Sequence, residues 1–206
     1  MNKKINHIAI VMDRSGSMGP LANEALSGLN DELKTIAKNA REFDQTTTIS
    51  LVTFSTKVDE PRFLELEEEV TDYNCSGWTA LNDAVGHTIQ MLKSIEVAEG
   101  EDVAYLVLIV TDGMENSSRE FSSEQIATMI NELEQRGNWT FTFMGAGANV
   151  FTQAATLGIK AGNSSAFAAT KHGLLEKEIR TSGALTSYYT GRQYGSSQSS
   201  NFFAGG

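Results

Sequence analysis

Five oxygen-bearing side chains that could bind a cation lie in three short segments of the 206-residue chain. Asp13, Ser15 and Ser17 alternate in the first segment, Thr79 lies in the second, and Asp112 lies in the third. Two carboxylates and three hydroxyls form an all-oxygen set that suits a hard cation, Mg²⁺ or Mn²⁺ in preference to Ca²⁺. The carboxylates nearly neutralise a divalent ion, and the hydroxyls add ligands without adding charge. The sequence therefore predicts a metal site.

The composition of this site favours binding over catalysis. Five protein ligands leave one position of an octahedral ion open, and a sparingly neutralised cation should accept a carboxylate from another molecule. None of the three segments contains a His that could act as a general base. We therefore expect no enzymatic activity, and we expect the partner to be another protein that supplies an Asp or Glu side chain.

Two alternatives for the first segment remain open. A metal-dependent hydrolase, such as a phosphatase with Asp13 as nucleophile, usually has a second carboxylate in this segment and a lysine nearby. Here Ser15 stands instead, and the only basic residue of the segment is Arg14, so the sequence disfavours hydrolysis. Taken one at a time, Asp13 and Ser15 could also be ordinary turn or helix-capping residues.

The predicted secondary structure brings the three segments together. Short apolar or β-branched runs alternate with longer stretches whose apolar residues recur every three or four positions. Strands are predicted at residues 8–12, 46–55, 58–66, 105–110, 139–144 and 159–161, and helices at residues 20–40, 81–95, 122–133, 150–157 and 171–185. The alternation predicts an α/β fold, a Rossmann-like, doubly wound, mostly parallel sheet of about six strands with one antiparallel edge strand and helices on both faces. Ligands bind such sheets outside the carboxyl ends of the strands, where Asp13 and Asp112 are expected.

The chain is predicted to form one domain over residues 1–187, followed by a flexible Gly/Ser/Phe-rich tail over residues 188–206. The tail contains a run of serines and glycine from Gly195 and the aromatic pair Phe202-Phe203. A disordered terminus is the simpler expectation. The alternative is that the aromatic pair docks into a neighbouring subunit of a larger assembly.

Charge and composition narrow the classes of partner and the location. Sixteen basic against twenty-six acidic residues give a net charge of −10, which repels nucleic acid and anionic membranes. The single cysteine, Cys75, cannot form an internal disulfide, and the apolar run 8–12 is too short for a signal peptide or a membrane span. We therefore expect a cytoplasmic protein with neither nucleic acid nor membrane as partner. His7, His87 and His172 lack a zinc-like spacing.

The three segments together resemble the metal-ion-dependent adhesion site of von Willebrand factor A domains and integrin inserted domains. Asp13-x-Ser-x-Ser17, Ser76-Gly-x-Thr-Ala-Leu81 and Thr111-Asp-Gly113 occur in that family's order and spacing. The stretches 112–121 and 141–151 resemble small stand-alone members from bacteria and their phages, and the similarity covers residues 6–185.

This resemblance implies a role for each candidate ligand. Ser15, Ser17 and Thr79 would bind the metal directly through their hydroxyls, and Asp13 and Asp112 would bind it directly or through water. The metal would then bridge to an acidic residue of a partner protein inside a bacterial cell. A structural role in a phage particle or another large complex is the alternative function.

Three further residues are expected at the rim of the site. Trp78 stands where the family commonly has a small residue, so its ring could narrow the cleft or contact the partner. Arg14 could pair with a carboxylate of the partner, and Glu115 could shape the rim.

Overall fold

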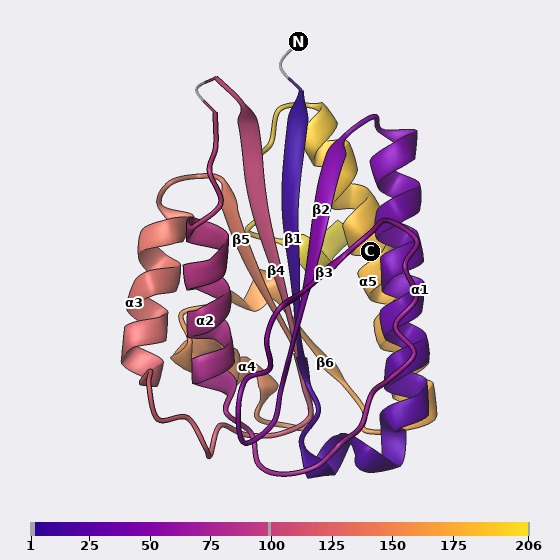
Figure 1. Ribbon diagram of the computed structural model, residues 1–206, viewed down its shortest axis with the longest axis vertical. Helices are drawn as coiled ribbons and strands as arrows, with labels where there is room; N and C mark the ends of the chain where they lie inside the picture. The colour runs from indigo at the N-terminus through magenta and orange to yellow at the C-terminus, as the bar shows by residue number, and fades with distance from the viewer. Residues whose placement is uncertain (1–2, 99, 206) are drawn as a thin grey trace.

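The computed structural model describes residues 3–98 and 100–205 (Figure 1). Within these ranges six strands form a sheet in the order β3-β2-β1-β4-β5-β6, parallel throughout except that β3 runs antiparallel to β2 at the edge. The strands are β1 (Lys4–Asp13), β2 (Thr46–Phe54), β3 (Arg62–Leu64), β4 (Asp102–Thr111), β5 (Trp139–Ala146) and β6 (Ser164–Phe167). The predicted fold class is confirmed, including the antiparallel edge strand that follows Pro61.

Helices cover both faces of the sheet (Figure 1). One face carries α1 (Ala22–Glu42) and α5 (Lys171–Gln193), and the other carries α2 (Leu81–Lys93), α3 (Ser123–Glu134) and α4 (Val150–Thr156). Short 3-10 helices occur at η1 (Gly16–Leu21), η2 (Ala161–Asn163) and η3 (Phe202–Gly205). In the part of the chain that the structure describes, no helix combines the length and apolar character needed to cross a membrane.

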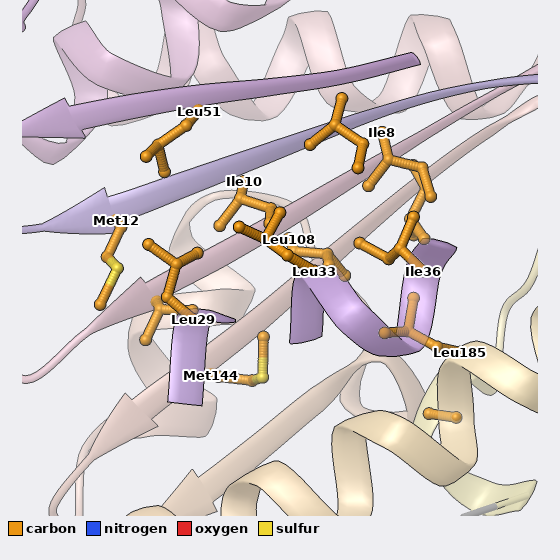
Figure 2. Packing of buried hydrophobic residues seen from close by; sticks show 14 of the residues in the cluster. Ile8, Ile10, Met12, Leu29, Leu33, Ile36, Leu51, Leu108, Met144 and Leu185 are labelled. Carbon is orange, nitrogen blue, oxygen red and sulfur yellow. The ribbon is translucent and has the colours of Figure 1, made fainter. Parts of the chain in front are cut away.

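Strand β1 lies in the centre of the sheet and is buried on both of its faces. Ile8 and Ile10 belong to the core beneath α1 and α5, and Figure 2 shows them in one cluster with Leu33 and Ile36 of α1. Ala9 and Val11 belong to the core beneath the helices of the opposite face. Burial on both sides explains why the run is continuously apolar, and each fully buried Ile contributes roughly 1.5–3 kcal/mol. This central strand holds its last residue, Asp13, in a fixed place.

The last strand differs from the sequence prediction. Residues 159–161 were expected to form it, but Ile159 packs into the core after α4 and the chain then turns through η2. Strand β6 begins only at Ser164, which pairs with Phe143 of β5. The prediction was wrong because Ser164 and Ser165 give no apolar pattern. Their burial is supported instead by hydrogen bonds, such as the 2.7 Å bond from Arg180 to the Ser165 hydroxyl.

The C-terminal region also departs from the prediction of a domain ending at residue 187 and a flexible tail. Helix α5 continues to Gln193, and Tyr189 is fully buried within the extension. Farther along, Phe202 is 3% exposed and its backbone N–H donates to Asn163 Oδ1 at 2.9 Å. Burial of aromatic side chains compensates the ordering entropy of the Gly/Ser-rich segment, which composition alone does not reveal.

Arg192 anchors this C-terminal region to the opposite end of the sheet from Asp13. Its side chain is fully buried and donates to Asn6 Oδ1 at 2.8 Å, to Asp102 Oδ1 at 2.7 Å and to the Asp102 carbonyl at 2.7 Å. The guanidinium thus joins the beginnings of β1 and β4 to the end of α5. These charge-assisted hydrogen bonds from one buried arginine hold the end of α5 against the starts of β1 and β4.

Candidate metal site

The two candidate carboxylates lie side by side at the carboxyl edge of the sheet. Asp13 is the last residue of β1, and Asp112 directly follows β4. These strands are parallel neighbours, with Met12 opposite Val110. Chain order reverses beside β1, because β2 lies on one side of it and β4 on the other. The side chains therefore meet where open α/β sheets bind their ligands.

Hydroxyl groups of the first segment reach across to the third. Ser17 Oγ donates to Asp112 Oδ1 at 2.6 Å, and Ser15 Oγ lies 3.1 Å from Ser17 Oγ. The Ser15 backbone N–H donates to Asp13 Oδ1 at 2.7 Å. Hydrogen bonds therefore connect four of the five predicted ligands, with Asp13 joined through the backbone N–H of Ser15; these side chains and Thr79 are called the oxygen cluster below.

Thr79, the fifth predicted ligand, is brought to the same place by the loop before α2. Its backbone N–H donates to Asn116 Oδ1 at 2.9 Å, which ties this loop to the one after β4. Gly113 lies between the two: a Cβ there would come within 2.8 Å of Thr79 Oγ1 and 3.5 Å of Asp13 Oδ2. The Thr79 hydroxyl and the Asp13 carboxylate therefore both lie next to Gly113, and a larger residue there would press against them.

Backbone hydrogen bonds hold the first and second segments against each other. The Gly16 N–H donates to the Gly77 carbonyl at 3.0 Å, and the Ser76 N–H donates to the Arg14 carbonyl at 2.9 Å. Gly77 has a φ of +84°, and a Cβ there would lie 2.5 Å from Thr56 Oγ1, so only glycine fits. The glycine of the Ser-Gly-x-Thr motif is therefore needed for the turn that presents Thr79.

The electrostatics of the site favour a cation. Burial raises the pKa of Asp13, and the neighbouring charge of Asp112 acts in the same direction, although hydrogen bonds from Thr111 and Ser15 oppose it. Burial likewise raises the pKa of Asp112. Throughout residues 3–98 and 100–205, neither carboxylate forms an ion pair with Lys, Arg or His. Partly dehydrated carboxylates without a basic partner are stabilised by a bound cation.

The donor set and its exposure fit a divalent ion with one accessible side. Asp13, Ser15 and Thr79 are buried, whereas Ser17 is exposed and Asp112 is half-buried. No group of three or more His, Cys, Asp or Glu side chains in the described ranges could hold a metal, so a cation at this site depends on the hydroxyls. Solvent reaches the site from the side of Ser17 and Asp112.

The family is settled by comparison with known sequences. The sequence profile of the von Willebrand factor type A domain matches residues 7–181, most of the chain. The chain belongs to the von Willebrand factor A family. A search of curated proteins gave no match.

Solved structures share the fold of this von Willebrand factor A domain at low sequence identity. A von Willebrand factor type A protein from Catenulispora acidiphila is 15% identical, with a TM-score of 0.57 over 88% of this chain and 42% of that one. Proximal thread matrix protein 1 from the mussel byssus, with zinc in its metal-ion-dependent adhesion site, is 17% identical, with a TM-score of 0.56 over 86% and 44%. The pilus adhesin SpaC from Lactobacillus rhamnosus GG is 12% identical, with a TM-score of 0.68 over 92% and 31%. The chain thus spans less than half the length of these proteins.

Of the expected rim residues of the A domain, only Trp78 is free to contact a partner. Its side chain is 67% exposed beside Thr79. Arg14 instead donates to both oxygens of Asp59 at 2.6 Å, and these hydrogen bonds hold the pKa of Asp59 below its usual value. Because its guanidinium is occupied within the domain, Arg14 does not fit the expected role of pairing with a partner.

Glu115 also has a role inside the A domain. Its Oε1 accepts from the backbone N–H groups of Ser117 and Ser118, and its Oε2 accepts from the Asn82 N–H at 2.8 Å and the Ser118 hydroxyl at 2.7 Å. Nearby, Asp83 accepts from backbone N–H groups of the same loop. Both carboxylates shape the loop after β4 through these bonds.

Two residues that hold the site were missed in the sequence. Thr111 Oγ1 donates to Asp13 Oδ2 at 2.5 Å, and the Tyr73 hydroxyl donates to the Asp13 carbonyl. Thr111 could have been found, because it precedes Asp112 in the Thr-Asp-Gly motif. Tyr73 lies in a loop without a pattern, so only the fold brings it to Asp13.

Proposed function

We propose that this A domain binds a divalent cation through Asp13, Ser15, Ser17, Thr79 and Asp112, and that the cation binds a carboxylate of another protein. Domains of this family generally mediate metal-dependent protein–protein interactions. The observation that carries the proposal is the contact of Ser17 Oγ with Asp112 Oδ1, which joins two segments 95 residues apart into one oxygen cluster. Neither acidic side chain has a basic partner within the described ranges to compensate its charge.

The oxygen ligands favour Mg²⁺ or Mn²⁺ as the resident ion. The mussel byssus protein holds zinc at its adhesion site, which supports divalent binding at this position of the fold. The hydroxyls of Ser15, Ser17 and Thr79 would coordinate through oxygen, and Thr111 would orient Asp13 by its hydrogen bond. When bound, the ion would supply a positive charge beside Ser17 and Asp112, the two proposed ligands that are not buried.

A binding role suits the side chains around the oxygen cluster better than a hydrolytic one. No His that could act as a general base lies in the three ligand segments. Arg14 donates to both carboxylate oxygens of Asp59, so its guanidinium is not available to bind a substrate. The net charge of −10 opposes nucleic acid and anionic membranes as partners. Trp78, exposed beside the cluster, offers an apolar contact to a protein surface.

The alternative function was that of a component of a larger assembly that docks into a neighbouring subunit through Phe202 and Phe203. The packing of these two side chains counts against it. Phe202 packs inside the domain against Tyr188, with a ring-centroid distance of 6.3 Å, and Phe203 packs against Phe202 at 5.0 Å. The pair is therefore engaged within its own chain.

The proposal can be tested with labelled peptides that carry one central Glu in a Gly/Ser sequence. Fluorescence polarisation should detect binding in Mg²⁺ or Mn²⁺, and chelator or replacement of Glu by Gln should abolish it. Asp112→Asn should abolish binding as well, whereas Thr128→Val, a hydroxyl removal on the exposed face of α3, should not. Equal binding of Glu and Gln peptides, or binding unaffected by chelator, would contradict a carboxylate-bridging metal.

A further inference from the structure

A pocket opens directly beside the oxygen cluster, between the loop after β4 and helix α4. Its volume is about 360 Å³, within the range of about 300–1,000 Å³ typical of ligand pockets. The buried side chains of Leu81 and Leu157 line it, and Met114, 62% exposed, stands at its rim. The pocket has no role in holding the cation.

The pocket is continuous with two of the segments that carry the proposed metal ligands. Leu81 follows Thr79 by two residues, and Met114 follows Asp112 by two residues. Two residues of chain span at most about 7 Å, so the pocket begins within one side chain's reach of the cluster. Gln153 of α4 donates from Nε2 to the Gly113 carbonyl at 3.1 Å, which fixes the far wall to the metal-binding turn.

Several polar groups of the lining are already used within the domain. Glu115 is held by backbone N–H groups and the Ser118 hydroxyl, and the Asn82 amide donates to the Ser123 hydroxyl at 3.2 Å. The Thr156 hydroxyl donates to the Thr152 carbonyl at 2.9 Å. Most of the exposed surface of the pocket is apolar, and Met114 is the most exposed apolar side chain of its lining, so this chemistry selects an apolar group.

We propose that this pocket receives a large apolar side chain, such as Leu or Phe, from the same partner segment that supplies the carboxylate to the metal. The inference rests on the proposed function and adds the partner's second recognition element. In an extended peptide, side chains two residues apart point the same way and are separated by roughly 7 Å. An acidic residue at the cation and an apolar residue two to four positions away would therefore fill both places.

The experiment extends the Glu peptides with Phe at positions −4 to +4 from the Glu, each compared with a matched Ser peptide. In Mg²⁺, Phe at one or two neighbouring offsets should tighten binding roughly ten- to a hundredfold, as expected for burying one large apolar side chain. Thr152→Trp places a ring in the pocket and should remove this gain. Thr128→Trp, the same change at an exposed position of α3 outside the pocket, should keep it.

A second measurement detects binding of an apolar group in the pocket when no metal is present. The methyl resonance of Met114, assigned by its loss in Met114→Ser, should shift with N-acetyl-phenylalaninamide in chelator and should not shift with N-acetyl-serinamide. Thr152→Trp should abolish the shift. Thermal melting of each variant checks that it is folded.

The outcomes separate the pocket from the metal. Glu peptides that respond to Mg²⁺ but gain nothing from Phe at any offset would overturn the pocket proposal and leave the proposed function standing. If the Met114 resonance shifts but peptide binding does not depend on Mg²⁺, the proposed function is overturned. The proposal that one partner segment occupies both the metal and the pocket is then overturned as well. Self-association that Thr152→Trp abolishes would make a second copy of the chain the occupant, which also overturns the proposal.

Discussion

The Ser17 hydroxyl donates a 2.6 Å hydrogen bond to Asp112 Oδ1, across 95 residues of sequence. The bond joins the loop after the central strand β1 to the loop after its neighbour β4. Both residues lie on the solvent side of the oxygen cluster, whereas Asp13 is fully buried behind them. The geometry of the cluster therefore depends on the pairing of β1 with β4 and on the small residues that allow their loops to approach.

Gly113→Ala should weaken metal binding without unfolding the domain. The new Cβ would lie 2.8 Å from Thr79 Oγ1, so the hydroxyl or the turn must move. We expect metal affinity to fall roughly ten- to a hundredfold, as for other changes beside metal ligands. Calorimetric titration with Mn²⁺ measures the change. Gly191→Ala is the control, because its Cβ would meet only Ser196 Cβ at an ordinary 3.6 Å; equal affinities for both variants would place Thr79 outside the site.

Phe202→Ala should destabilise the domain by about 3–5 kcal/mol, because it empties a buried aromatic site. Phe202 is 3% exposed and packs against Tyr188 of α5. Tyr194→Ala, at a side chain that is 85% exposed, should change little. Urea unfolding followed by circular dichroism measures both. A Phe202→Ala variant as stable as the parent would restore the flexible tail that the sequence indicated.

The Asp102 ion pairs should make stability depend on pH at the acid end. Burial works against ionisation of Asp102, but hydrogen bonds from Lys4 and Arg192 outweigh it and hold the pKa of Asp102 below its usual value. A carboxyl whose pKa is lower in the folded than in the unfolded chain adds stability above the unfolded value. That stability is lost as the pH falls through the folded value.

Asp102→Asn should therefore lower stability at neutral pH and flatten the decline in stability on acidification. The free energy of unfolding, measured by urea titration at a series of pH values, gives both quantities. Asp31→Asn, at an exposed position of α1, is the matched control. Parallel acid profiles for the parent and Asp102→Asn would show that the ion pairs with Lys4 and Arg192 do not carry the effect.

The fold and most of the cluster could be predicted because the relevant information is local. The continuously apolar run of β1 marks a central strand, and Asp13, Ser15 and Ser17 alternate within the turn that follows it. The helix after Asp112 was also marked in advance. Its capping box is present, with Ser122 Oγ accepting from the Gln125 N–H at 3.2 Å.

What could not be predicted depends on partners distant in sequence. Arg14 looks like a free rim residue until the fold places Asp59 beside it, 45 residues away. Arg192 lies in a polar stretch, and its burial depends on Asn6 and Asp102, 186 and 90 residues away. Side chains whose role is set by such contacts carry no periodic pattern, so composition suggested a flexible tail where the chain is packed.

Calorimetric titration of Mg²⁺ and Mn²⁺ into the chain measures directly whether these oxygen atoms hold a divalent cation. We expect one bound ion, with binding abolished in Asp112→Asn and strongly weakened in Thr79→Val. Thr128→Val, which removes a hydroxyl from the exposed face of α3, should bind as the parent does. Unchanged metal affinity in Asp112→Asn and Thr79→Val, or no metal binding by the parent chain, would contradict a cation site at these residues.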